Sequence, residues 1–181
     1  MDVLRKTFYF GWQRWLQRYL RTKLLYYFTM RRMARIVSVS EGGVADIQSL
    51  FWGADPEKLS AIANGLDFSR FSGVEAGDRS ALFGPELASK RLFITVSRLA
   101  SKKNLERLLR AFSHVHSAYP NVGLIIVGDG QLRARLEAFV ASKGLGSSVA
   151  FLGFREDIPT LLKTADIYAI PSLREGLPRS L

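Results

Sequence analysis

The second half of the chain alternates regularly between short apolar runs and amphipathic stretches. Four apolar runs predict buried strands, at residues 92–96, 122–127, 149–152 and 167–170. Helical spacing between them predicts helices over 104–118, 131–142 and 158–164. Strands that are apolar on both faces and alternate with helices are typical of a parallel sheet with helices on both sides. The predicted fold class is therefore α/β, with a Rossmann-like parallel sheet.

The first half is less regular. Over residues 3–35, aromatic and aliphatic residues recur three or four positions apart, with Arg and Lys on the other face. A helix of this kind either packs on a sheet or lies in a membrane interface with its cations on anionic lipid, and the sequence leaves both open. A short strand is predicted at 36–39, followed by a helix that Ser40 caps and a second strand at 59–62.

Residues 72–89 contain several glycines and a proline without sustained periodicity, which predicts a linker. The expected organisation is thus a first segment over 1–71, the linker over 72–89 and an α/β unit over 90–181.

The net charge of +10 is concentrated at the N-terminus, because residues 1–40 hold nine Lys and Arg and a single acid. This asymmetry predicts an anionic partner for residues 1–40, the N-terminal arm, and that partner is either lipid headgroups or nucleic acid. The chain has no cysteine, which excludes disulfides and thiolate chemistry. No apolar run is long enough to predict a transmembrane helix. The expected location is cytoplasmic. The N-terminal arm could additionally bind peripherally to the inner face of a membrane.

Candidate chemistry follows two of the predicted strands. In a doubly wound sheet the first and fourth strands are neighbours where the winding reverses, and ligands bind at their carboxyl ends. Arg98 and Lys103 follow the first strand, and Glu175 follows the fourth. The helix that begins near Asn104 would point free N–H groups at the same crevice. These groups predict a diphosphate site, and the Glu175 carboxylate suits sugar hydroxyls.

Two other features suggest different chemistry. Gly128-Asp129-Gly130 resembles the start of a dinucleotide fingerprint, but Arg133 stands where its third glycine belongs. A dinucleotide-binding module is therefore an alternative function. His114 and His116 are two positions apart on a predicted helix, so they cannot share a metal ion as residues four apart can. No metal or other cofactor is expected.

Six short motifs occur in a fixed order over residues 36–181. They are Val37–Glu41, Ile62–Asp67, Ser97–Lys103, Val127–Gly130, Leu152–Phe154 and Pro171–Pro178. In this order they resemble the motifs of the glycosyl transferases group 1, which are GT-B glycosyltransferases of family 4. Two positions differ from the family pattern, because Ala63 stands where proline is usual and Ser97 where glycine is usual.

The resemblance implies transfer of a sugar, with retention of configuration, from a nucleotide-diphosphate-sugar donor to an acceptor. By position, Arg98 and Lys103 would hold the donor diphosphate, and the catalytic-site residue Glu175 would contact the donor sugar. The backbone near Phe154 would meet the nucleobase. Residues 174–181 are similar to those of enzymes that extend polyprenyl-diphosphate lipids, which implies a lipid-linked acceptor and suits an arm on anionic membrane. No nucleic-acid partner is implied.

The resemblance also predicts that parts of the family architecture are missing. A second family glutamate, eight positions after Glu175, would fall beyond Leu181, and most of the family's N-terminal domain has no counterpart here. The expectation is a fragment with the end of an acceptor domain over 1–71 and most of a donor domain over 90–181, inactive on its own. The alternative is a non-catalytic basic module that binds membrane or nucleic acid.

Overall fold

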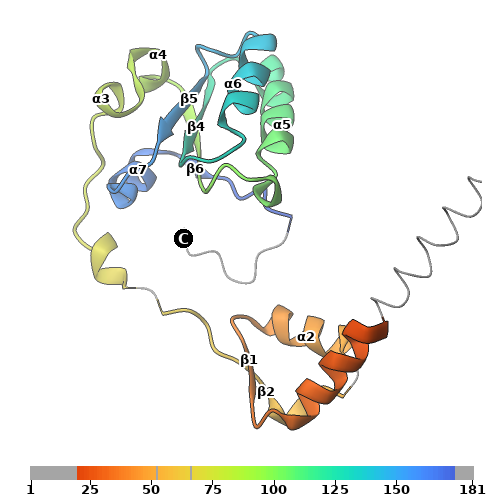
Figure 1. Cartoon of the computed structure of the whole chain (residues 1–181). Coiled ribbons are helices and arrows are strands. Elements are labelled where there is room, and N and C mark those ends of the chain that lie inside the picture. The colour runs from red at the N-terminus through yellow and green to blue at the C-terminus, as the bar shows by residue number, and fades with distance from the viewer. Residues whose placement is uncertain (1–19, 52, 66, 174–181) are drawn as a thin grey trace, which may run out of the picture. The chain divides into compact units, whose positions relative to one another are not determined.

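The computed structural model describes residues 20–51, 53–65 and 67–173. They form two compact units, which meet in the sequence between residues 65 and 66 (Figure 1). The first unit is small, and the second contains the larger sheet and the two hydrophobic core clusters.

The first unit has a two-stranded parallel sheet. Strand β1 (Ile36–Ser38) pairs with β2 (Leu59–Ala61), and α2 (Glu41–Leu50) lies between them in the sequence. The Ser40 hydroxyl accepts a hydrogen bond of 3.1 Å from the Gly43 N–H at the start of α2. The two predicted strands and the predicted cap are confirmed.

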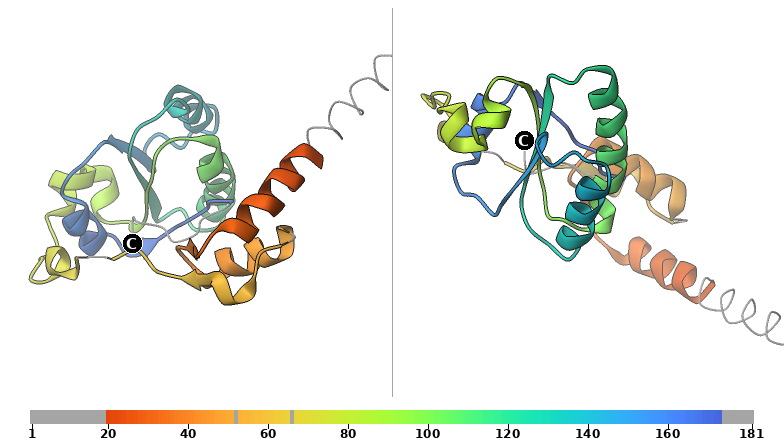
Figure 2. Two further views of the ribbon diagram at one scale, coloured as in Figure 1. Left: turned by 60° about the horizontal axis from the view of Figure 1, so that its bottom comes forward. Right: turned by 90° about the horizontal axis from the view of Figure 1, so that it is seen from above.

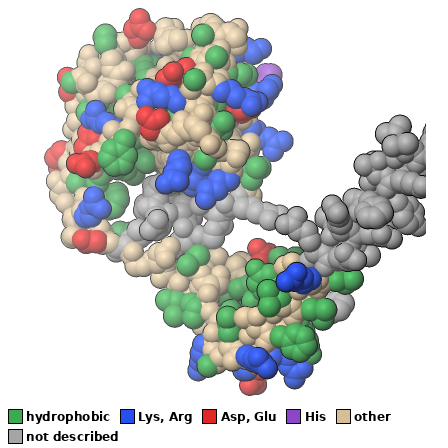
Figure 3. Space-filling view, in the orientation of Figure 1, with side chains coloured by type: hydrophobic (Ala, Val, Ile, Leu, Met, Phe, Trp, Pro, Cys, Tyr) green, Lys and Arg blue, Asp and Glu red, His purple; other side chains and the backbone are tan. Residues whose placement is uncertain are grey.

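Residues 20–32 of the first unit are helical. The remainder of the helix predicted over 3–35 falls mainly on 3–19, outside the described residues. The Tyr26 ring lies 4.7 Å from the Phe51 ring, centroid to centroid. In contrast, Leu24, Leu25 and Phe28 are each more than half exposed. Hydrophobic side chains accordingly mark the visible surface of this unit together with Lys and Arg (Figure 3).

The second unit has a four-stranded parallel sheet in the order β5-β4-β3-β6. Its strands are β3 (Arg91–Val96), β4 (Val122–Val127), β5 (Val149–Gly153) and β6 (Ile167–Tyr168). The α/β fold class is confirmed, as is the expected contact between the first and fourth strands of this half. Strand β6 is shorter than predicted because pairing with β3 ends at Tyr168.

Helices cover both faces of this sheet (Figures 1 and 2). One face packs against α5 (Leu105–Ala118) and α6 (Arg133–Ser142), and the other against α7 (Ile158–Thr164) with two short helices. Strand β4 lies at the centre of both clusters: Leu124 and Ile126 point to the first, Ile125 and Val127 to the second. This two-sided burial explains why β4 is apolar throughout.

The stretch 72–89, predicted as a linker, contains the two short helices α3 (Arg79–Phe83) and α4 (Pro85–Ala88). Phe83 and Leu87 are each 5% exposed and belong to the core cluster on the α7 face. Gly84 separates the helices with a φ of 91°, in the region that favours glycine. Residues 79–88 of the predicted linker therefore form short helices that pack on the sheet. Two helices this short are too brief to produce a periodic pattern.

Asp166 anchors the start of β6 to β3 and α3. Its carboxylate accepts hydrogen bonds from the Leu92 N–H at 2.7 Å and from the Arg79 guanidinium at 2.9 Å. Burial acts to raise the pKa of Asp166, but the Leu92 N–H and the Arg79 guanidinium outweigh it and hold the pKa below its ordinary value. The charged carboxylate is therefore the form that stabilises the fold.

We expect Asp166→Asn to lower the free energy of unfolding by about 1–3 kcal/mol at neutral pH, because charge-assisted hydrogen bonds are lost. The folded pKa of Asp166 lies below its unfolded value, so its stabilising contribution is complete above about pH 4 and is lost as the pH falls through the folded pKa. Urea unfolding should show that the difference in free energy of unfolding between wild type and Asp166→Asn becomes smaller at acidic pH. Glu156→Gln, which changes an exposed carboxylate in the same unit, should leave the free energy of unfolding within about 0.5 kcal/mol of wild type. A difference that stays constant with pH would contradict the role given to the carboxylate charge.

Candidate functional site

Two loops lie side by side at the carboxyl ends of β3 and β6. The Asn104 side-chain amide donates a hydrogen bond of 3.2 Å to the Pro171 carbonyl. The Leu173 N–H donates one of 3.1 Å to the Lys102 carbonyl. The structure thus brings together the loops that were predicted to meet where the sheet winding reverses.

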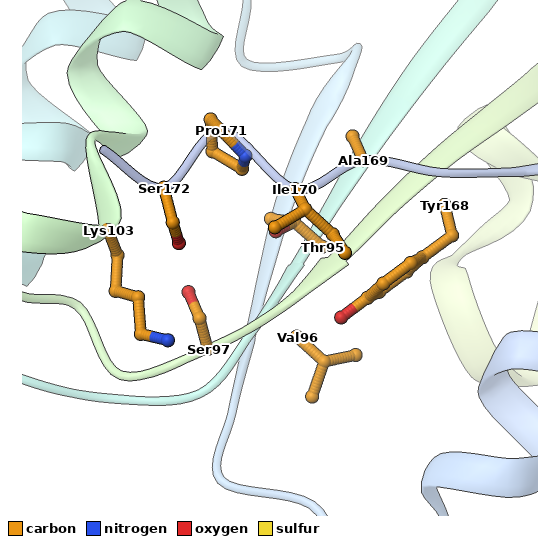
Figure 4. A pocket seen from close by; sticks show the side chains of 9 residues that line it. All are labelled: Thr95, Val96, Ser97, Lys103, Tyr168, Ala169, Ile170, Pro171 and Ser172. Atoms are coloured by element: carbon orange, nitrogen blue, oxygen red, sulfur yellow. The ribbon is translucent and has the colours of Figure 1, made fainter. Parts of the chain in front are cut away.

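A pocket opens between these loops (Figure 4). Its lining residues are Thr95, Val96, Ser97, Lys103, Tyr168, Ala169, Ile170, Pro171 and Ser172. With the open space at its mouth it measures about 210 Å³.

The N-terminus of α5 lies beside this pocket, directly after Lys103. Asn104 precedes the helix in the left-handed conformation, with a φ of 55°. Its side chain bonds to Pro171 and does not cap α5. Because the first N–H groups of a helix lack partners within the helix, this end can bind an anion through its backbone and dipole.

Arg98 and Lys103 occupy different positions at this edge of the sheet. Lys103 is half-buried and lines the pocket. Arg98 is exposed and is not among the lining residues. The next residue, Leu99, is fully buried, and its N–H donates a hydrogen bond of 2.9 Å to the Asp129 carbonyl. The backbone of Arg98 is therefore anchored, while its side chain extends into solvent.

Gly128 and Gly130 bring the loop after β4 directly against the loop after β3. A Cβ on Gly128 would lie 2.1 Å from the Ser97 carbonyl oxygen, and one on Gly130 would lie 2.6 Å from that of Leu99. Neither space tolerates a side chain, because the atoms that it would meet belong to the backbone. The two glycines thus have a packing role. In a dinucleotide fingerprint the missing Cβ makes room for a pyrophosphate, but here that space is filled by the backbone of Ser97 and Leu99.

Phe154 follows β5 at the same edge of the sheet and is 78% exposed. It does not line the pocket. The neighbouring Gly153 carbonyl accepts a hydrogen bond of 2.7 Å from Gly128, which connects this loop to the glycine pair. Arg155 binds Asp157 through two hydrogen bonds, of 2.8 and 2.5 Å, and holds the pKa of the Asp157 carboxyl below its ordinary value. The loop that presents the Phe154 ring is thereby braced.

The remaining site predictions concern Glu175, the histidines and the membrane. Glu175 lies outside the described residues, as does all of 174–181. His116 lies 2.8 Å from the Ser148 hydroxyl, in contact with the core of the second unit. Among residues 20–51, 53–65 and 67–173, no three His, Asp or Glu side chains are grouped to hold a metal ion. Within the same ranges, no helix combines the length and the apolar character that crossing a membrane requires.

The structure adds two hydroxyl groups that the sequence analysis did not single out as site residues. Ser97 and Ser172 line the pocket, and their side chains point into the same space as that of Lys103 (Figure 4). Both are small polar residues that come soon after an apolar strand at the predicted switch point. That position could have identified both serines as site residues from the sequence, and so could the presence of Ser97 where the family usually has glycine.

Comparison with known families agrees with these observations. The model of the family "Glycosyl transferases group 1" matches residues 83–181, more than half of the chain. An Escherichia coli protein named UDP-Gal:alpha-D-GlcNAc-diphosphoundecaprenol alpha-1,3-galactosyltransferase is 32% identical over 131 residues. That match covers 70% of this chain and 34% of the relative. The chain thus spans about a third of the length of the curated relatives that it matches.

Solved structures show the same relationship. The crystal structure of Anabaena Alr3699/HepE in complex with UDP aligns with a TM-score of 0.67 and 27% sequence identity. The alignment covers 81% of this chain and 40% of that one. TarM of S. aureus, 17% identical with a TM-score of 0.68 over 83% of this chain and 28% of its own, shares the fold. With these matches, the chain belongs to the glycosyl transferases group 1, the family 4 glycosyltransferases of GT-B fold.

Proposed function

We propose that the second unit binds the nucleotide-diphosphate part of a sugar donor, for a retaining glycosyltransferase of polysaccharide biosynthesis. The observation that carries this proposal is the convergence of Lys103 and two hydroxyl groups on one pocket, with the uncapped N-terminus of α5 beginning two residues after Lys103. A phosphate oxygen accepts hydrogen bonds from all of these groups, and each charge-assisted bond contributes about 1.5–3 kcal/mol. In this proposal residues 1–71 belong to the acceptor side and 90–181 to the donor side.

The individual roles follow the family resemblance. Lys103 binds the diphosphate from within the pocket, and Arg98 closes over it from the exposed edge. The backbone near Phe154 contacts the nucleobase, and Glu175 contacts the donor sugar as the residue nearest the reaction. UDP is the favoured nucleotide, because Alr3699/HepE is described in complex with UDP and the Escherichia coli relative is named for UDP-Gal. In this proposal the residues named above bind the donor without a metal ion or other cofactor.

Calorimetric titration of the whole chain tests the donor proposal. UDP should bind at a single saturable site, and UMP should bind more weakly because it lacks the second phosphate. NAD is the control ligand, since it also contains a diphosphate but joins two nucleosides. Selective binding of NAD over UDP would replace this proposal with the dinucleotide module. The absence of UDP binding would overturn the donor role.

We further propose a lipid-linked acceptor and a peripheral position of the arm on the inner, anionic face of a membrane. The support comes from the name of the Escherichia coli relative, which specifies a diphosphoundecaprenol acceptor, and from the exposed side chains of residues 20–32. Leu24, Leu25 and Phe28 supply apolar surface, and Arg21 and Arg31 supply cations near them. Apolar insertion and attraction to anionic lipid reinforce each other in such helices.

Leu25→Asp is expected to weaken binding to vesicles that contain phosphatidylglycerol, by about tenfold, because a carboxylate replaces inserted apolar surface and is repelled by anionic lipid. Co-sedimentation with these vesicles and with neutral phosphatidylcholine measures the preference. Tyr119→Asp, which alters an exposed aromatic residue of the second unit, is the matched control and should bind like wild type. Equal binding to anionic and neutral vesicles would contradict the proposal. Binding to DNA with a steep salt dependence and no lipid affinity would favour the nucleic-acid module.

A further inference from the structure

The Ser97 hydroxyl is buried and has no hydrogen-bond partner among the described residues. Ser97 comes directly after β3, and its N–H donates a hydrogen bond of 3.0 Å to the Val127 carbonyl. Its Oγ is shielded from solvent, and within the described part of the chain no group lies in position to hydrogen-bond to it. Native proteins leave few buried polar atoms unsatisfied, because each carries a free-energy penalty, and such an atom in a pocket needs an explanation.

The surroundings of this hydroxyl favour an anionic oxygen as its missing partner. Ser97, Lys103 and Ser172 line one pocket. In Figure 4 the hydroxyl ends of the two serines face each other, and the Lys103 ammonium lies beside Ser97. None of the described lining residues is acidic. An ammonium only donates hydrogen bonds, and a serine hydroxyl donates readily, so a group with acceptor oxygens alone fits between them.

We propose that Ser97 is a donor-binding residue whose hydroxyl donates a hydrogen bond to the terminal phosphate group of the nucleoside diphosphate, beside Lys103. This inference rests on the proposed function of the second unit. The glycine that is usual at this family position carries no hydroxyl, so the contact distinguishes chains with serine from those with glycine. Without ligand, the hydroxyl has no partner among the residues that the structure describes, and binding of the diphosphate would supply one.

Replacing the Ser97 hydroxyl should therefore change the stability of the protein and its affinity for the diphosphate in opposite directions. Ser97→Ala removes the unsatisfied hydroxyl, so the ligand-free protein should melt at the same temperature as wild type or higher. The same variant loses a hydrogen bond to the ligand, so its affinity should fall. A serine with a merely structural role would show the reverse, with a lower melting temperature and unchanged affinity.

The test measures thermal melting and calorimetric binding of UDP and UMP for the whole chain. Ser97→Ala should weaken UDP binding about tenfold, as expected for loss of one charge-assisted hydrogen bond. It should weaken UMP binding less than about twofold, because UMP lacks the terminal phosphate. Ser97→Gly, which restores the usual family residue, should give the same loss. Ser101→Ala, at an exposed serine of the same loop, is the matched control and should change neither quantity.

The outcomes separate this inference from the proposed function. If wild type binds UDP and both Ser97 variants bind it equally well, the role of Ser97 is overturned and the donor site stands. If the variants lose UDP and UMP affinity alike, the assignment to the terminal phosphate is overturned. If wild type does not bind UDP, the proposed function falls and this inference falls with it.

Discussion

Replacing Gly128 by alanine is expected to lower the free energy of unfolding by about 2–6 kcal/mol. The new Cβ would lie 2.1 Å from the Ser97 carbonyl oxygen, and backbone cannot move aside as a flexible side chain can. Overpacking of this kind costs about 1–3 kcal/mol. Gly128 also has a φ of 123°, where a residue with a side chain is strained by a further 1–3 kcal/mol or so.

Chemical unfolding followed by circular dichroism measures this effect. Gly146→Ala is the matched control, because Gly146 is exposed and a Cβ there would meet nothing within 4 Å. The control should unfold within about 0.5 kcal/mol of wild type. The Gly128 variant should also lose UDP affinity, since the backbone that it displaces carries Ser97 and Arg98. Equal stability of the two variants would contradict the packing role of Gly128.

Replacing Lys103 by alanine is expected to weaken UDP binding by about 10–150-fold, the equivalent of one charge-assisted interaction of about 1.5–3 kcal/mol. Lys103 is half-buried in the pocket, so water screens its charge less than that of an exposed lysine. Lys102→Ala removes the same charge from the adjacent, exposed side chain and should cost less than about threefold. Calorimetric titration at two salt concentrations measures both variants.

The two lysine variants together separate a specific contact from general attraction. If both lose affinity equally, and the loss disappears at high salt, the effect comes from net charge and Lys103 is not a diphosphate ligand. A loss that is confined to Lys103 and persists in salt supports a direct contact. Both variants should unfold like wild type, because neither side chain belongs to the hydrophobic core clusters.

Much of the second unit was predictable from the sequence, because buried elements require apolar residues at regular spacing. The apolar run at 122–127 became β4 with its expected bounds, and 158–164 became α7. The neighbouring position of β3 and β6 followed from the general winding of α/β sheets and the lengths of the connections. Residues 72–89 were harder to predict, since helices of five and four residues contain too few turns to show a period.

The candidate site was predictable in its location but not in its contacts. Lys103 was placed at the pocket by the rule that ligands bind at the carboxyl ends of strands where the winding reverses. The same rule treated Arg98 alike, yet Arg98 extends into solvent while Lys103 lines the pocket. The difference arises because the buried Leu99 anchors the turn after Arg98, and the turn at 101–103 brings Lys103 back toward β6.

The sequence by itself determined the fold class, the order of the elements and the family, because apolar spacing and short motifs are local properties of the chain. The tertiary structure alone decided that Asn104 reaches the Pro171 carbonyl, that Gly128 lies against the Ser97 backbone, and that the Ser97 hydroxyl has no partner in the described residues. Hydrogen bonds and close approaches depend on distances between segments that are far apart in the sequence. Those distances are set only when the sheet and its helices pack together.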